Sequence, residues 1–170
     1  MVSLTRSLRE TWTALKSWPD AKQSVAATKV AVPALAIIAG IGFLSGWLHW
    51  YPHDRWQEYV KAVLVSLFLI ALPFELVFRG LLLSTLAQII PRWAAWISTF
   101  LFVAYFPIYG LLNQTKWNGV FQMPSFWFAM LIFGIILSHI RIRSGSLWTV
   151  ILIHGFAAAT WMAFLGGRSY

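Results

Sequence analysis

A chain of 170 residues has room for one domain, and a composition that is 59% hydrophobic and only 11% charged excludes an ordinary soluble protein, in which about 25% of residues are charged. The formal net charge is +8, but the basic residues flank apolar stretches, so we interpret them as topology signals and contacts with anionic lipid headgroups rather than as a nucleic-acid surface. The absence of cysteine excludes a disulfide, a thiolate metal site and a cysteine nucleophile within these residues. The composition therefore predicts an all-α, polytopic bundle of transmembrane helices.

The N-terminal segment, residues 1–29, is basic and amphipathic. Leu4, Leu8 and Trp12 recur at helical spacing among lysines and arginines. This pattern predicts a short helix that lies on the membrane surface, and the first apolar run lies too far from Met1 for a secretory signal peptide. We expect residues 1–29 to form a basic amphipathic segment and residues 30–170 to form the transmembrane helical domain.

Five apolar runs follow, each close to or longer than the roughly 20 residues that cross a bilayer as a helix. Pro33 is expected in the first turn of its helix, where proline is tolerated. Pro73 is expected to kink one long, tilted helix, and Pro107 to interrupt the next. The expected spans are residues 30–50, 60–90, 93–112, 120–140 and 147–165.

The basic residues outside these spans predict the orientation of the chain. Eight lysines and arginines fall on the side that holds the N-terminus, Arg92 and the turn at residues 141–143, and four fall on the other side. Cytoplasmic loops carry the excess of positive charge. We therefore expect the N-terminus in the cytoplasm and the C-terminus on the opposite side. The four residues on the other side are Arg55, Lys61, Lys116 and Arg168.

Glu75 alone among the five acidic residues lies deep in an apolar run. An ionisable side chain at membrane depth costs a few kcal/mol unless it has a partner. Arg79 is four residues further on, so both side chains project from one face of a helix. Two interpretations stay open: the two residues neutralise each other as a structural ion pair, or they belong to an intramembrane active site.

Three histidines, His49, His53 and His139, are weaker candidates for a functional site. His49, His53 and Asp54 lie close in sequence, but Pro52 breaks the helix that would align them as metal ligands. His139 lies beside a basic turn and is expected to be an interfacial side chain. We therefore predict no metal site from the sequence.

Three segments of the chain carry recognisable motifs. Residues 74–80 read Phe-Glu-Leu-Val-Phe-Arg-Gly, residues 102–106 begin and end with phenylalanine, and residues 141–158 hold a basic Gly-Ser-Leu-Trp turn followed by His154. Together they resemble the CAAX-processing and bacteriocin-processing (CPBP) intramembrane proteases, also called the CAAX prenyl protease 2 / lysostaphin resistance protein A-like or Abi group. The corresponding motifs of that family are Glu-Glu-x-x-x-Arg-Gly, Phe-x-x-x-His, and a basic Gly-Ser-Leu-Trp turn followed by His-x-x-x-Asn. The resemblance covers roughly residues 60–165 and implies a CPBP-like helical membrane fold.

The resemblance also implies a degenerate site. Phe74 stands where the family has the glutamate understood to activate water, Phe106 stands in place of a histidine, and Ala158 replaces an Asn or Asp. Phenylalanine can neither take a proton from water nor bind a metal. Glu75 and His154 remain, which is fewer than the roughly three protein ligands of a catalytic metal.

Three functional hypotheses follow. The first is a member of the family that has lost catalysis and serves as a scaffold, assembly factor or accessory subunit, bound to a membrane protein, a larger membrane complex or a lipidic partner. The second is an active CAAX-type endopeptidase with a reduced site, in which Glu75 is the base and His154 orients the water. The third, motivated by the many aromatic residues, is a pigment- or quinone-associated subunit of an energy-transducing complex; otherwise no cofactor is predicted.

Overall fold

The computed structural model describes residues 3–113 and 118–166, with the side chain of Asn118 left out, and within these ranges it is helical with no strand. Lys116 and Arg168, which entered the charge count, lie outside the described residues. In chain order the elements are α1 (Leu4–Lys16), α2 (Ala21–Leu44), α3 (Trp56–Leu64), η1 (Val65–Ala71), α4 (Leu72–Glu75), η2 (Leu76–Leu82), α5 (Leu83–Ile89), α6 (Ala94–Leu112), α7 (Asn118–Phe121), α8 (Pro124–Ser144), α9 (Leu147–Thr160) and η3 (Trp161–Leu165), where η marks π-helix.

Among the described residues, five helices are long and apolar enough to cross a membrane, which confirms the predicted bundle. The second of them, Trp56–Ile89, is one continuous helix of 34 residues that runs from α3 to α5. At 1.5 Å per residue it is about 51 Å long, so it must tilt in, or extend beyond, a hydrocarbon core of about 30 Å. Pro73 has no N–H to donate and lies between the π-helical segments η1 and η2, where the regular hydrogen-bond ladder is interrupted.

The predicted bounds of the first span are wrong. Helix α2 begins at Ala21 because Asp20 forms a capping box with Gln23, and it ends at Leu44. Pro33 therefore lies inside the helix rather than in its first turn. The predicted start at residue 30 follows the last lysine before the apolar run, Lys29. The capping box marks the start of the helix better, because the aliphatic part of a lysine side chain can lie along a membrane helix while its charge reaches the interface.

Two later expectations also need correction. Pro107 does not interrupt its helix, because α6 continues to Leu112. The fourth span begins at Pro124, at the first turn of α8, and is preceded by the separate short helix α7. Helix α8 ends at Gly145, whose φ of 68° is the left-handed conformation that glycine adopts without steric cost. The spans at α6 and at α9 with η3 agree closely with the predicted ranges.

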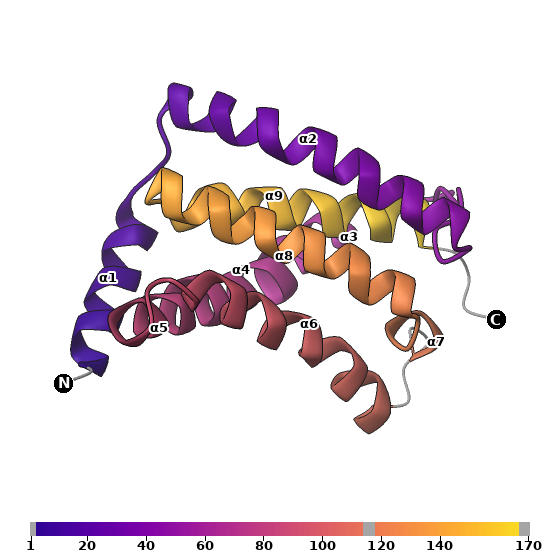
Figure 1. The fold of residues 1–170 in the computed structure, drawn as a ribbon. Helices are drawn as coiled ribbons and strands as arrows, with labels where there is room; N and C mark the ends of the chain where they lie inside the picture. The colour runs from indigo at the N-terminus through magenta and orange to yellow at the C-terminus, as the bar shows by residue number, and fades with distance from the viewer. Residues whose placement is uncertain (1–2, 114–117, 167–170) are drawn as a thin grey trace.

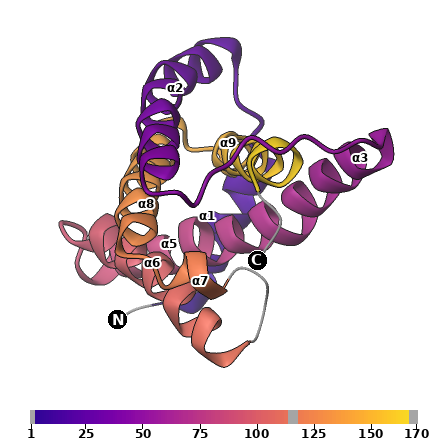
Figure 2. The same cartoon turned by 90° about the vertical axis from the view of Figure 1, so that its right-hand side faces the viewer.

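The long helices run side by side, and α1 lies across one end of them (Figures 1 and 2). Helix α8 packs against both α2 and α6, while α9 packs against η1 and α4 of the long second span. The two ends of the described chain lie at opposite ends of the bundle (Figure 1). That arrangement suits an odd number of spans, but which end faces the cytoplasm stays a prediction. The largest fully buried apolar side chains are Phe102, Phe126, Leu137, Leu147 and Ile151.

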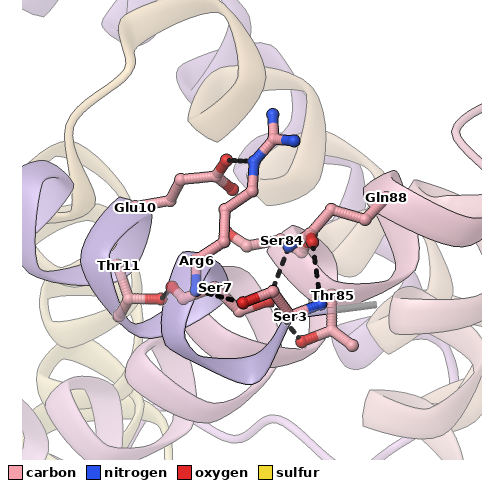
Figure 3. A network of polar contacts seen from close by, with 8 residues as sticks. All are labelled: Ser3, Arg6, Ser7, Glu10, Thr11, Ser84, Thr85 and Gln88. Atoms are coloured by element: carbon pink, nitrogen blue, oxygen red, sulfur yellow. Dashed lines mark hydrogen bonds and ion pairs between the residues drawn. The ribbon is translucent and has the colours of Figure 1, made fainter. Parts of the chain in front are cut away.

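Helix α1 is attached to the bundle by hydrogen bonds along its small polar face (Figure 3). Ser7 is fully buried, and its Oγ accepts hydrogen bonds from Thr85 Oγ1 at 2.9 Å and from Gln88 Nε2 at 2.8 Å. Near the other end of α1, Trp148 Nε1 donates to the carbonyl of Leu15 at 2.8 Å. Leu4, Leu8 and Trp12 form an exposed apolar row on α1, beside its buried face. Its contact with the membrane surface remains a prediction.

We expect Ser7→Ala to loosen α1, because it leaves the partly buried hydroxyl of Thr85 without its acceptor and removes one of the two acceptors of the Gln88 amide. An unsatisfied buried donor costs about 1–3 kcal/mol. Hydrogen–deuterium exchange of the α1 amides should therefore become faster by at least about fivefold. The matched control is Thr13→Ala on the exposed face of α1, which should leave exchange nearly unchanged. Equal exchange in the two variants would contradict the role assigned to Ser7.

Candidate functional site

Three ionisable side chains meet at the centre of the bundle. Glu75 and Arg79 are both 0% exposed, and Arg79 Nη1 lies 3.4 Å from Glu75 Oε1. His154 Nδ1 lies 2.6 Å from the same carboxylate oxygen. The guanidinium group of Arg79 also donates to the carbonyl of Gly134 at 3.2 Å and lies 4.2 Å from the centre of the Phe102 ring. Glu75 is thus held by a cation and by an imidazole, and the cation is held by a carbonyl and an aromatic face.

Local structure and small residues explain this meeting. Glu75 ends α4 and Arg79 lies in η2, so a separation of four residues places both on one face of the helix. Gly155 lets α9 approach η1, since a Cβ there would lie 3.0 Å from the side chain and 3.4 Å from the Cα of Leu67. Gly134 plays the same part on α8, where a Cβ would lie 2.7 Å from the Thr99 methyl group. Close helix contact through glycine is typical of membrane bundles.

Two of the positions that depart from the family pattern, Phe74 and Phe106, lie beside this cluster. The rings of Phe74 and Phe106 stack with centroids 6.2 Å apart, and Phe74 also meets the His154 ring at 6.1 Å. Phe102 joins them, 5.3 Å from Phe106. Aromatic faces and edges therefore fill the space beside the imidazole where two proton-transfer groups would have stood.

A cavity of about 410 Å³ opens beside these residues, lined by His154 and by the departing positions Phe74, Phe106 and Ala158. No Asp, Glu, Lys or Arg is among its described lining residues, so Glu75 and Arg79 lie behind the cavity wall. His154 connects the two regions, because it touches Glu75 on one side and the cavity on the other. This separation bears on the catalytic roles that the sequence suggested for Glu75 and His154, since the imidazole rather than the carboxylate reaches the space where a ligand would lie.

Sequence reasoning missed the remaining walls of the cavity. Helices α2, α6, α7 and α8 and the segment after α2 provide most of them. The abundance of aromatic residues was the one sequence signal, and it entered only the pigment or quinone hypothesis. The missed residues include Leu35, Trp47, Leu48, Phe126 and Phe133.

The other candidate histidines lie elsewhere. His53 Nε2 is 3.1 Å from the carbonyl of Met162, and the hydroxyl of Tyr59 donates to the carbonyl of His53 at 2.8 Å. These contacts tie the segment after α2 to the C-terminal end of the last span. His139 is exposed. Within residues 3–113 and 118–166 no three His, Cys, Asp or Glu side chains gather in a way that could hold a metal ion, and Glu75 with His154 supplies only two ligands.

A family model described as Type II CAAX prenyl endopeptidase Rce1-like matches residues 56–160 of the chain. This range includes the long second span, α6, α8 and all of α9, and therefore every position compared above. No curated protein and no solved structure shows significant similarity to the chain.

Proposed function

Because the chain belongs to the Type II CAAX prenyl endopeptidase Rce1-like family and is accordingly a multi-pass integral membrane protein, we propose that it keeps the family framework without peptide hydrolysis. In this proposal it is a scaffold or accessory subunit that holds a membrane protein or lipidic partner in the cavity beside His154. Helix α1 rests on the cytoplasmic membrane surface, where its exposed apolar row and basic residues meet anionic lipid headgroups.

The observation that carries the proposal is the pair of phenylalanine rings beside His154. Hydrolysis needs a base within about 3 Å of a water and usually a second group that holds the water or the developing charge. Phe74 and Phe106 offer neither, and their stacked rings give the wall of the cavity an apolar surface instead. Glu75 is fully buried and already bonded by Arg79 and His154, so it serves as the centre of an electroneutral structural cluster.

One observation favours a second function, an endopeptidase with a reduced site. A carboxylate that orients an imidazole is the arrangement that prepares a histidine as a general base, and the Glu75–His154 contact at 2.6 Å has this form. In that case the roles expected from the sequence are exchanged: His154 takes the proton from water, and Glu75 orients the imidazole. Among the described lining residues this alternative has no charged group to stabilise the oxyanion, and only uncharged donors such as Tyr105 and Thr160 lie on the cavity side.

The two functions predict different outcomes for the purified protein. As a binding protein, it should leave a prenylated CAAX peptide intact and should keep its membrane partner through purification in mild detergent. Ala157→Trp, which adds an indole to the cavity wall, should release the partner. The control Leu152→Trp, on an exposed position of the same helix, should retain it.

The proposal is wrong if the peptide is cleaved at a rate that both Glu75→Gln and His154→Ala abolish, because that pattern identifies the endopeptidase. It is also wrong if the partner remains equally bound to both tryptophan variants, since the cavity would then not be the binding surface.

A further inference from the structure

The imidazole of His154 presents a hydrogen-bond acceptor to the cavity. Its Nδ1 contacts Glu75 Oε1, and the second ring nitrogen, Nε2, is separated from Nδ1 by one ring carbon, so its lone pair is directed away from that carboxylate. The rings of Phe102 and Phe133 pack edge-to-face against the imidazole, with centroids 6.1 and 5.3 Å away, and neither offers a hydrogen-bond donor. The hydrogen bond that His154 makes to another described side chain is the one from Nδ1 to Glu75.

The contact with Glu75 identifies the ring nitrogen that carries the hydrogen. The carboxylate of Glu75, which is paired with Arg79, can only accept a hydrogen bond, so His154 Nδ1–H donates to it. In the neutral imidazole the Nε2 lone pair is then free as an acceptor. The carboxylate behind the ring polarises it and strengthens that acceptor.

The rest of the cavity selects a neutral, elongated molecule. Its described lining has no charged side chain, so a phosphate, carboxylate or ammonium head would remain unpaired. Along α9 and η3 the wall extends from His154 to Leu165, about 16 Å at 1.5 Å per residue. Phe156 borders the cavity and is 67% exposed, so the space reaches the surface of the bundle. The other polar lining groups are the uncharged side chains of Trp47, Tyr105, Tyr109, Thr160 and Trp161.

From these observations we propose that the cavity binds a neutral long-chain lipid alcohol, whose hydroxyl group donates a hydrogen bond to His154 Nε2 and whose hydrocarbon chain extends along α9 and η3 toward Leu165. This inference rests on the proposed function in one respect, namely that the cavity binds a ligand and does not hydrolyse a peptide. It specifies the ligand by its head: a hydroxyl donor, in place of an ether or ester, which only accept, or a carboxylate, which is charged.

The test uses the full chain in lipid nanodiscs and three photoreactive probes of equal length. They are tetradecanol with a diazirine at its far end, the methyl ether of the same compound, and the corresponding carboxylate. The alcohol should label residues 161–165 or Phe121, at the end of the cavity away from His154. A buried hydrogen bond contributes about 0.5–1.5 kcal/mol, so the alcohol should label about two- to twelvefold more strongly than the ether. The carboxylate should label least.

Two variants locate the site. His154→Phe removes the acceptor and should reduce labelling by the alcohol to the level of the ether. This variant also leaves Glu75 with one hydrogen-bond partner fewer and could fail to fold, so a second pair of variants, at Ala158 and Ala159, keeps the test valid. Ala158→Phe fills part of the cavity and should abolish labelling, while the adjacent Ala159→Phe, which does not line the cavity, should leave labelling unchanged.

Equal labelling by alcohol and ether, stronger labelling by the carboxylate, or full labelling of Ala158→Phe would overturn the inference. Labelling of residues beside His154 in place of the far end would also overturn it, because the ligand would then lie in the opposite direction. If the alcohol does not label the cavity while Ala157→Trp still releases the membrane partner, the inference about the ligand is wrong and the proposed function stands. If the partner also stays bound, the proposed function fails with it.

Discussion

Glu75→Leu alone is expected to lower the free energy of unfolding by about 3–5 kcal/mol, because it leaves the fully buried guanidinium of Arg79 without its counter-ion. Arg79→Met alone should cost a similar amount, since the carboxylate would then keep only the His154 imidazole. Most domains are stable by only about 5–15 kcal/mol. Each single variant should therefore yield much less monodisperse protein after extraction, and unfolding in mixed micelles should begin at lower denaturant.

The combined variant should be more stable than either single one. With Glu75→Leu and Arg79→Met together no buried charge is left unpaired, and a buried ion pair replaced by apolar residues of similar size is often near neutral. Recovery should remain partial, because His154 Nδ1 and the carbonyl of Gly134 lose their partners. Adding His154→Phe should recover more, since it removes the orphaned imidazole.

A catalytic glutamate would give the reverse pattern. Glu75→Gln would then fold like the wild type and lose turnover, and the double apolar variant would fold without regaining it. If Glu75→Leu and Arg79→Met each unfold at the same denaturant concentration as the wild type, the structural role of the pair is wrong. Retention of the membrane partner, measured for the same variants, separates loss of folding from loss of function.

Phe102→Ala should have the next largest effect, about 3 kcal/mol of lost stability. Phe102 is 0% exposed, its ring meets Phe78 at 5.5 Å and Phe106 at 5.3 Å, and it covers the Arg79 guanidinium at 4.2 Å. Phe→Ala in soluble cores costs about 3–5 kcal/mol. In a bilayer the lower end applies, because lipid is as apolar as the protein core and the cost comes from lost contacts and the space left behind.

The matched control is Phe100→Ala on the same helix, whose ring is 58% exposed. It should change stability by less than about 0.5 kcal/mol. Phe102→Leu, which keeps most of the volume, should cost less than about 1.5 kcal/mol. Equal unfolding of Phe102→Ala and Phe100→Ala would show that the aromatic cluster does not stabilise the centre of the bundle.

Much of the candidate site could be predicted from the sequence because its parts are local signals. A lone carboxylate in an apolar run is costly without a partner, and an arginine four residues away lies on the same helix face. The carboxylate and guanidinium atoms are indeed 3.4 Å apart. The structural role of this pair, the catalytic roles of Glu75 and His154, the partner and the orientation in the membrane stay predictions.

The sequence by itself determined the fold class and the approximate spans, because hydropathy and length decide which segments can satisfy their backbone inside a bilayer. Tertiary structure alone decided that His154 and Arg79 share one oxygen of Glu75 and that α1 is bonded to the bundle through Ser7. It also decided that parts of all five spans, together with α7 and the segment after α2, enclose a cavity beside the imidazole. Such contacts join residues far apart in the chain, and they depend on how closely glycines such as Gly134 and Gly155 let helices approach. No local pattern of hydropathy specifies that distance.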